Sequence, residues 1–330
     1  MTLVSFRPIG ANNVDPPEAV GRPDPNSRSL VYVEGTGLVN VDPYEQGGCR
    51  RRRGAVLDVP GISPHSGWSN GREAYFVEGS ALKRFWPGAG SEIVTLLSNN
   101  EPAEFSQVND IIVMSNGVDF IVIEGGAVAT PFVPVDPFKV RMSPGRLLEF
   151  YNGRLYAALG NVLYCSDSLD TQGGIEQMDE RQNVVAVFSS EITLLKRVDG
   201  GLFVSDETET FFFQGADPVI DPGFAQKPIF PYPAVAGTAA RIAPGQLGSE
   251  AQGEAAVWVS EKGVCLGLPG GSAVNLSDGT FSPPRGRRGA AVIREENGQV
   301  HFLCVMRDPT PAHNTHDARE LSTISLPIQE

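Results

Sequence analysis

The residues of this chain that could do chemistry are few, and the histidines come first. Two of them form the run HNTH, where both rings would share a face only on a helix, but two prolines stand just before it. A third lies in QVHFLCV, where strand alternation predicts a half-buried side chain opposite Phe302. No Gly-x-Ser-x-Gly elbow or Gly-rich phosphate loop is present. We therefore expect neither catalysis nor metal binding from the four histidines, His65, His301, His313 and His316.

Paired carboxylates are the second candidate, because glycosidases use two acids on either side of the scissile bond. The runs SDETETF (205–211) and LSDGTF (276–281) weakly resemble the Asp-box turn of sialidase-like propellers. Neither has the full Ser-x-Asp-x-Gly-x-Thr-Trp pattern, and DSLDTQGG lacks the ligand spacing of a calcium loop. Strand-ending turns explain these runs, so we expect no enzyme activity and no cofactor.

The cysteines are far apart and form no CxxC pair, which argues against both a disulfide framework and a zinc site. We expect all four to be small buried or half-buried side chains: Cys49, Cys165, Cys265 and Cys304.

The charge pattern points to contacts with proteins. The formal net charge is −13, which argues against a general nucleic-acid-binding surface. Two basic runs, CRRRRG (49–54) and RGRRG (285–289), depart from this acidic background. They predict a local contact with a neighbouring subunit, and the alternatives are a contact with phosphate and an exposed loop without a binding role. The predicted contact residues are Arg50, Arg51, Arg52, Arg53, Arg285, Arg287 and Arg288.

These residues must be carried by β-strands, since a hairpin pattern recurs along the chain. Each unit has a short β-type segment, a turn rich in Gly, Asn, Asp, Ser or Glu, and in five of six cases a second segment. The irregular spacing is typical of four-stranded propeller blades. The first segments are REAYFVEG (72–79), NDIIVMSNG (109–117), GRLYAALGN (153–161), GGLFVSDET (200–208), EAAVWVSEKG (254–263) and QVHFLCVMR (299–307).

The pattern predicts an all-β protein, a six-bladed β-propeller closed by its N-terminal strands. The sixth unit lacks a second segment, whereas SLVYVEGTGLVNVD (29–42) belongs to no complete unit, and joining the two removes open sheet edges. Five or seven blades and an irregular double sandwich are the alternatives. We expect an extended N-terminal arm (1–28), a propeller (29–307) and a C-terminal tail (308–330), without a membrane span or secretory signal.

The arm has two interpretations, because its composition is too polar to pack by itself. It lies either across a neighbouring subunit or along its own propeller. Its core is the stretch Asn12, Asn13, Val14, Asp15, Pro16, Pro17, Glu18, Ala19 and Val20.

Several segments together resemble a group of tailed-bacteriophage virion proteins. These are GANNVDPPEAV, GLVNVDPYEQGGCRRRRGAV, GRLYAALGNVLYCSDSLD, ITLLKRVDGGLFVSDETETFFFQGADP and AVWVSEKGVCLG followed by RRGAAVI. The similarity covers most of the chain. It implies a β-propeller of the phage tail, similar to the nozzle, or packaged-DNA-stabilising protein, of short-tailed phages. A tail-tip or baseplate-hub protein of a long-tailed phage would look similar.

The resemblance implies a non-enzymatic structural protein of the virion, made in the host cytoplasm. We expect a homo-oligomeric ring, a hexamer, that extends the DNA conduit below the portal and adaptor. Its neighbours would be the adaptor and fibres, and double-stranded DNA would pass through it transiently during genome ejection. A receptor-binding or glycan-processing propeller of the virion is the alternative, and a generic intracellular scaffold propeller comes third.

Overall fold

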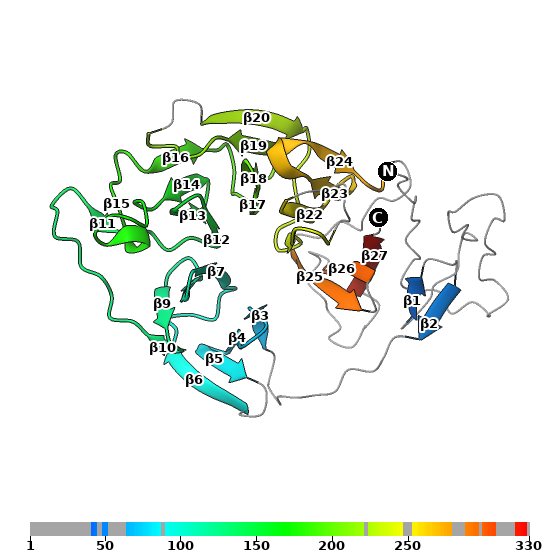
Figure 1. The fold of residues 1–330 in the computed structure, drawn as a ribbon, viewed down its shortest axis with the longest axis horizontal. Helices are drawn as coiled ribbons and strands as arrows, with labels where there is room; N and C mark the ends of the chain where they lie inside the picture. The colour runs from blue at the N-terminus through cyan, green and yellow to red at the C-terminus, as the bar shows by residue number, and fades with distance from the viewer. Residues whose placement is uncertain are drawn as a thin grey trace, which may run out of the picture. The chain divides into compact units, whose positions relative to one another are not determined.

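Antiparallel strands make up nearly all the regular structure in a computed structural model of the chain (Figure 1). The structure describes residues 41–44, 48–51, 64–86, 90–220, 224–246, 253–278, 288–296, 299–307 and 321–328. Within these ranges the helical elements are two single turns of 3₁₀ helix, η2 (Gly174–Glu176) and η3 (Pro269–Gly271). None of the described residues belong to a helix long and apolar enough to cross a membrane.

The chain divides into two units, and the second unit consists of residues 55–195 and 215–224. It holds three four-stranded antiparallel sheets whose strands follow chain order across the sheet. A small two-stranded sheet of β11 (Val140–Arg141) and β15 (Gln177–Met178) is added to them. The larger sheets are β3 (His65–Ser69), β4 (Ala74–Glu78), β5 (Ala81–Trp86) and β6 (Gly90–Leu96); β7 (Glu104–Val108), β8 (Ile111–Ser115), β9 (Phe120–Glu124) and β10 (Ala127–Val128); β12 (Leu147–Tyr151), β13 (Arg154–Leu159), β14 (Val162–Cys165) and β16 (Val184–Val187).

The first unit consists of residues 1–54, 196–214 and 225–330. Its sheets repeat the same up-and-down order. The strand β17 (Leu194–Val198) begins with two residues of the second unit. The sheets are β1 (Val41–Tyr44) and β2 (Gly48–Arg51); β17, β18 (Gly201–Ser205), β19 (Thr210–Gln214) and β20 (Ala225–Phe230); β21 (Ala240–Ile242), β22 (Ala255–Ser260), β23 (Gly263–Gly267) and β24 (Ala273–Asn275); β25 (Arg288–Glu296), β26 (Gln299–Arg307) and β27 (Leu321–Ile328).

This repeated four-stranded meander is the blade of a β-propeller, so the predicted fold class, an all-β β-propeller, is confirmed. Each predicted first segment of a hairpin forms the second strand of a sheet, from β4 to β26. The blade number and the closure of a ring stay predictions.

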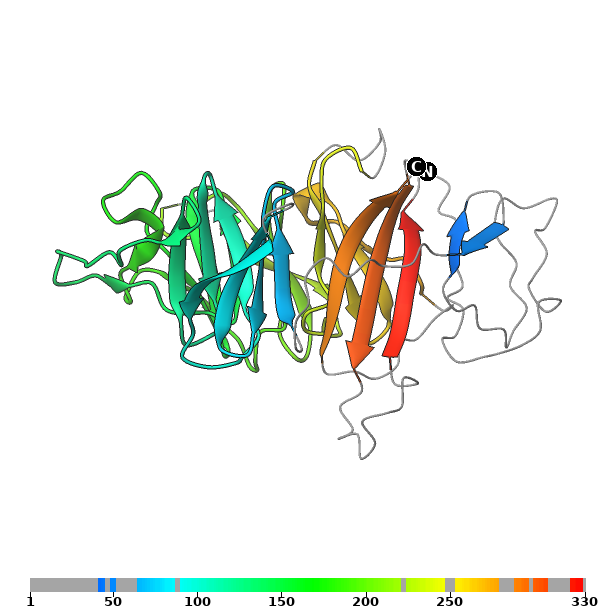
Figure 2. The same ribbon diagram turned by 90° about the horizontal axis from the view of Figure 1, so that it is seen from below.

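The last sheet differs from expectation in the strand that extends it. β27 pairs with β26 along eight residues, from Arg307 with Leu321 to Val300 with Ile328. Figure 2 shows β25, β26 and β27 side by side. This strand comes from the segment predicted as a tail, whereas the N-terminal strands β1 and β2 pair with each other. Pro327 concealed the strand, because proline within a β-type run indicates an edge strand or none.

Asparagine and aspartate close several of the hairpin turns in the same way. The side-chain Oδ1 of Asn70, Asn116 and Asp206 accepts hydrogen bonds from the backbone nitrogens two and three residues further on, at 2.7 to 3.1 Å. Such Asx turns hold the reversal without help from neighbouring sheets. The turn at Asp206 is the strand-ending turn that SDETETF predicts.

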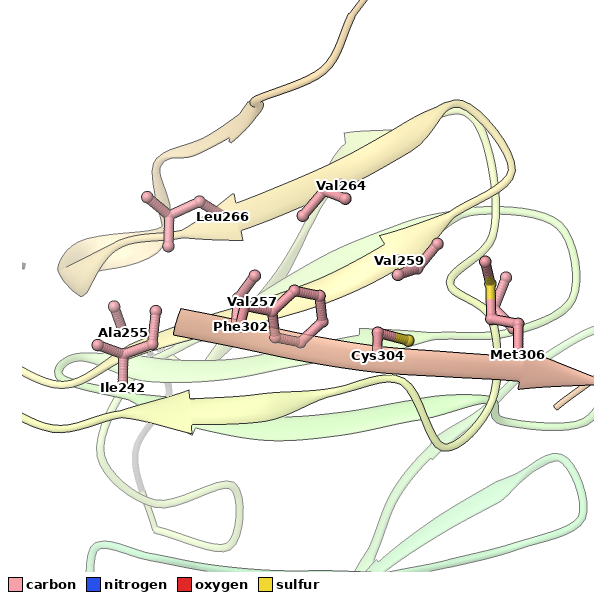
Figure 3. Close-up of a cluster of buried hydrophobic side chains, with 10 residues drawn as sticks. Ile242, Ala255, Val257, Val259, Val264, Leu266, Phe302, Cys304 and Met306 are labelled. Atoms are coloured by element: carbon pink, nitrogen blue, oxygen red, sulfur yellow. The ribbon is translucent and has the colours of Figure 1, made fainter. Parts of the chain in front are cut away.

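The core is built from alternating strand residues, and Figure 3 shows the part that lies between β22, β23 and β26. Val257 and Val259 of β22 point to the same side as Val264 and Leu266 of β23, and all four are buried. Phe302, Cys304 and Met306 of β26 cover them, each two residues from the next as a strand face requires. Similar clusters fill the spaces within the second unit.

Candidate functional site

Of the arginines predicted to make contact with another subunit, the structure describes three. Arg50 and Arg51 lie in β2, where their Cα partners are Asp42 and Val41 of β1. Arg288 is exposed and begins β25. Arg52, Arg53, Arg285, Arg287 and the whole arm stretch, residues 12–20, lie outside the described residues.

The histidines lie in structural positions where they are described. His65 Nε2 and Asn100 Oδ1 are 2.8 Å apart, which ties β3 to the segment after β6. His301 is fully buried in β26, deeper than the half-buried position expected of it. His313 and His316 lie outside the described residues.

A buried polar site in the second unit is built around Arg154 of β13. Its Nε donates to Asp217 Oδ2 at 2.8 Å, and its Nη1 donates to the carbonyl of Ser166 at 2.8 Å. Both side chains of this ion pair are largely buried, 8% and 13% exposed. The pair joins β13 to the segment that links β19 to β20.

Two further hydrogen bonds fasten that linking segment to the turn between β12 and β13. Tyr151 donates its hydroxyl to the Gly215 carbonyl and Asn152 donates its amide to the Ala216 carbonyl, both at 2.7 Å. Asn152 has a positive φ of 45°, a conformation that asparagine tolerates better than most residues. Residues 215–217 are therefore held at three successive points.

Asp167 is the centre of a second buried group beside the first. Its carboxylate accepts hydrogen bonds from Gln177 at 3.0 Å and Asn183 at 3.2 Å and forms an ion pair with Lys139. Gln177 belongs to β15, and Asn183 belongs to the segment before β16. Asp167 therefore connects separate parts of the insertion between β14 and β16. A buried carboxylate with these partners stabilises the conformation of the insertion that contains them.

The nucleophilic groups in this region are kept neutral. Burial raises the pKa of the Cys165 thiol to about 12, and it also raises the pKa of the fully buried Tyr156 above its usual range. Thiols and phenols that stay protonated at neutral pH are poor nucleophiles. Cys165 and Tyr156 are therefore poorly suited to nucleophilic chemistry.

Three of the cysteines are free and buried, as predicted: Cys165, Cys265 and Cys304. The side chain of Cys49 lies outside the described residues. Among the residues that the structure describes, no group of His, Cys, Asp and Glu could hold a metal ion.

The tryptophans are engaged in packing. Trp258 of β22 is fully buried, with its ring 5.3 Å from that of Phe203. Trp68 stacks on Phe105 at 6.0 Å, and the guanidinium of Arg84 lies 4.6 Å from the Trp86 ring centre. Trp258 and Trp68 thus pack between neighbouring sheets, because Phe203 belongs to β18 and Phe105 to β7.

The clearest binding feature is a set of large apolar side chains left exposed on the second unit. We call them the apolar rim. Sequence analysis did not single them out, since an isolated exposed apolar residue is ordinary. The rim consists of Ile93 (61% exposed), Leu96 (71%), Val128 (42%), Val133 (75%), Val135 (82%) and Phe138 (62%).

Three members of the rim lie on two outer strands that approach each other. Ile93 and Leu96 belong to β6, and Val128 belongs to β10, whose Cα atoms come within 8 Å of β6. The other three lie on the extended segment that joins β10 to β11, which loops outward in Figure 1. Prolines at positions 131, 134 and 137 keep this segment extended. Clustered exposed apolar residues of this kind mark protein contact sites.

Comparisons with known proteins bear on the architecture alone. No protein-family model matches the chain. No curated protein matches it either. The extracellular domain of a one-component system from B. thetaiotaomicron has a TM-score of 0.48 at 11% identity. The match covers 79% of this chain and 35% of that one.

PorZ, a surface component of the type-IX secretion system of Porphyromonas gingivalis, has a TM-score of 0.39 at 13% identity, with 79% of this chain and 33% of that one covered. The chain thus spans about a third of the length of these two proteins. The Neurospora crassa Pan2 WD40 domain has a TM-score of 0.44 at 10% identity, with 72% and 71% covered. Propellers support many functions, so such likenesses do not bear on what this chain does.

Proposed function

We propose that the chain is a structural, protein-binding component of a bacteriophage tail. It assembles as a homo-oligomeric ring, a hexamer, in the manner of a nozzle, and extends the conduit through which double-stranded DNA leaves the particle. The resemblance of its segments to tailed-phage virion proteins supports the phage setting. The adaptor and fibres are the neighbouring proteins expected from that resemblance.

The apolar rim is the observation that carries a protein-binding role. Six large side chains on adjoining elements are 42% to 82% exposed, and burying them against another subunit would remove unfavourable apolar surface from water. In the same unit, the buried groups around Arg154 and Asp167 fasten loops to strands, which suits a subunit under mechanical load. The acidic balance of the chain suits a conduit along which DNA slides without adhering.

Quantitative mass spectrometry of purified phage particles tests this role. The number of copies of the chain is scaled to a portal protein of known copy number in the same particle. We expect six copies per particle, and twelve would still indicate a symmetric tail ring. Absence from particles would contradict the proposal, and glycan binding or glycosidase turnover by the purified chain would favour a receptor-binding or glycan-processing propeller instead.

A further inference from the structure

Exposed apolar side chains are distributed unequally between the two units. Of the twelve large apolar residues that are exposed among the described residues, eleven belong to the second unit. The exception is Val292 of β25 in the first unit. The surface that a partner would cover therefore lies mainly on the second unit.

Charge is distributed unequally as well. The second unit has 8 of the 26 Lys and Arg residues of the chain but 19 of its 39 Asp and Glu residues, so most of the net charge of −13 belongs to it. The first unit is close to neutral and contains both arginine runs. The acidic excess of the chain thus lies in the second unit, whereas its arginine runs lie in the first.

Exposed carboxylates lie next to the rim. Glu92 precedes Ile93 on β6, Glu124 ends β9 just before β10, and Asp136 follows Val135. Two rims facing each other would place these like charges together, which disfavours a symmetric contact. A cationic partner would meet both the apolar side chains and the carboxylates.

Arginine suits this surface, and the chain itself shows the geometry. The guanidinium of Arg181 lies 4.7 Å from the centre of the Phe138 ring. Arginine pairs with carboxylates through its planar fork and covers apolar groups with its aliphatic stem. An arginine cluster from another subunit can make the same kinds of contact with the rest of the rim.

The first unit presents one such arginine, among the residues whose side chains are described, at the end of the sheet formed by β25, β26 and β27. Arg288 is exposed at the start of β25, and its cross-strand partner in the ladder is Arg307 at the end of β26. An exposed arginine at a strand end can pair with a carboxylate of a second copy through its planar fork. Arg50 and Arg51 of β2 belong to the same unit, whose β1 comes within 8 Å of β27.

We propose that the apolar rim of one copy binds the Arg288 end of β25 in a second copy, head to tail. Because the two surfaces differ, the contact is heterologous, and repetition produces a closed ring or an open filament. This inference deepens the proposed ring assembly and rests on it, but it does not depend on the phage setting.

Cysteine cross-linking of the full-length protein tests the contact. In a Cys49→Ser background, Val135→Cys and Arg288→Cys proteins are prepared separately and treated with a short bis-maleimide reagent. We expect neither protein alone to cross-link, a mixture of the two to give a cross-linked dimer, and the double variant to give a ladder of larger species. Val118→Cys paired with Arg288→Cys is the matched control, because Val118 is 58% exposed in the same unit but lies at the other end of β9.

A charge exchange gives an independent measurement that does not require a reactive thiol. Arg288→Glu and Asp136→Arg should each weaken self-association about tenfold in analytical ultracentrifugation, because each places like charges at the contact. The double variant should restore most of the loss, which general misfolding would not do. Circular dichroism of each variant verifies that it is folded.

Three results would overturn the head-to-tail contact: dimers of Val135→Cys alone, equal cross-linking by the control pair, or no cross-linking by any variant. Failure of the proposed phage function has a different signature. A protein that forms the ladder in solution but is missing from particles would retain the head-to-tail contact and lose its place in a tail. A protein that is present in particles but forms no ladder would keep its place in a tail and lose the head-to-tail contact.

Discussion

Arg154 and Asp217 form a largely buried ion pair at 2.8 Å, although they are 63 residues apart in the chain. The pair holds the segment between β19 and β20 against β13 of the second unit. Since Arg154 also donates to the Ser166 carbonyl, loss of the carboxylate would leave a buried cation with only part of its hydrogen bonds. Because removing one carboxylate leaves Arg154 buried without its charge partner, the pair is a sensitive test of how residues 215–217 contribute to the stability of the second unit.

Asp217→Asn should therefore destabilise the protein by about 3 kcal/mol, the usual cost of breaking a buried pair from one side. Urea unfolding followed by circular dichroism measures the change. Glu101→Gln is the matched control, because Glu101 and its partner Arg146 are 48% and 41% exposed and 3.6 Å apart. That control should shift the free energy of unfolding by less than about 1 kcal/mol, and equal effects of the two substitutions would contradict the structural role of the buried pair.

Two phenylalanines distinguish the core from the apolar rim. Phe203 is fully buried, with its ring 4.9 Å from that of Phe212, so Phe203→Ala should cost about 3 to 5 kcal/mol of unfolding free energy. Phe138 is 62% exposed, and Phe138→Ala should cost less than about 1 kcal/mol while weakening self-association. Thermal unfolding and analytical ultracentrifugation of both variants check this separation. A large loss of stability in Phe138→Ala would place this residue in the core instead.

Acid should weaken the hairpin at Asp119. Partial burial raises the pKa of this carboxyl, but hydrogen bonds from Ser98 and Asn116 outweigh burial and hold it below its usual range. A lowered folded-state pKa means that the stabilisation is fully present above the unfolded pKa of about 4 and is lost as the pH falls through the folded value. Urea midpoints between pH 2 and pH 5 should fall less steeply in Asp119→Asn than in the unchanged protein. Identical slopes would show that these hydrogen bonds do not favour the charged form.

Alkaline pH should act through the three buried thiols. Burial raises the pKa of Cys165 and Cys304 to about 12 and that of Cys265 to about 11, above the ordinary value of 9.0. A raised folded-state pKa means that stability is full below pH 9 and declines between pH 9 and 12, since only the unfolded thiols ionise there. The native protein should also react slowly with a thiol reagent at pH 8 and rapidly in urea. Rapid reaction of all three in the native protein would contradict their burial.

The sequence predicted the strands well because they depend on local pattern. Alternating apolar residues bounded by Gly, Asn and Asp turns locate each hairpin, and the structure places β4 and β5 at REAYFVEG and ALKRF as expected. Asx turns reinforce this, because Asn116 binds backbone nitrogens only two and three residues away. Contacts between residues two or three positions apart can be predicted from a short stretch of the sequence.

The candidate contact surfaces could not be predicted in the same way. The Arg154–Asp217 pair joins residues far apart in the chain, and no periodic pattern connects them. The rim became visible only when exposure was known, since Val135 and Phe138 have the residue types of a buried strand. The arginine runs were evident from composition, yet their partner depends on assembly. Sequence patterns locate strands, whereas the exposure of each side chain follows from how those strands fold.

The pairing of β27 with β26 also has a consequence for the timing of folding. Most of the described strands pair with the strand just before them across a short turn, so these hairpins can form soon after their residues leave the ribosome. β26 ends at Arg307, but its partner begins at Leu321, and synthesis of the intervening residues leaves the outer edge of β26 unpaired for a time. An open edge invites strands from other nascent chains. Residues 321–328 thus complete the last sheet and end its exposure to aggregation during translation.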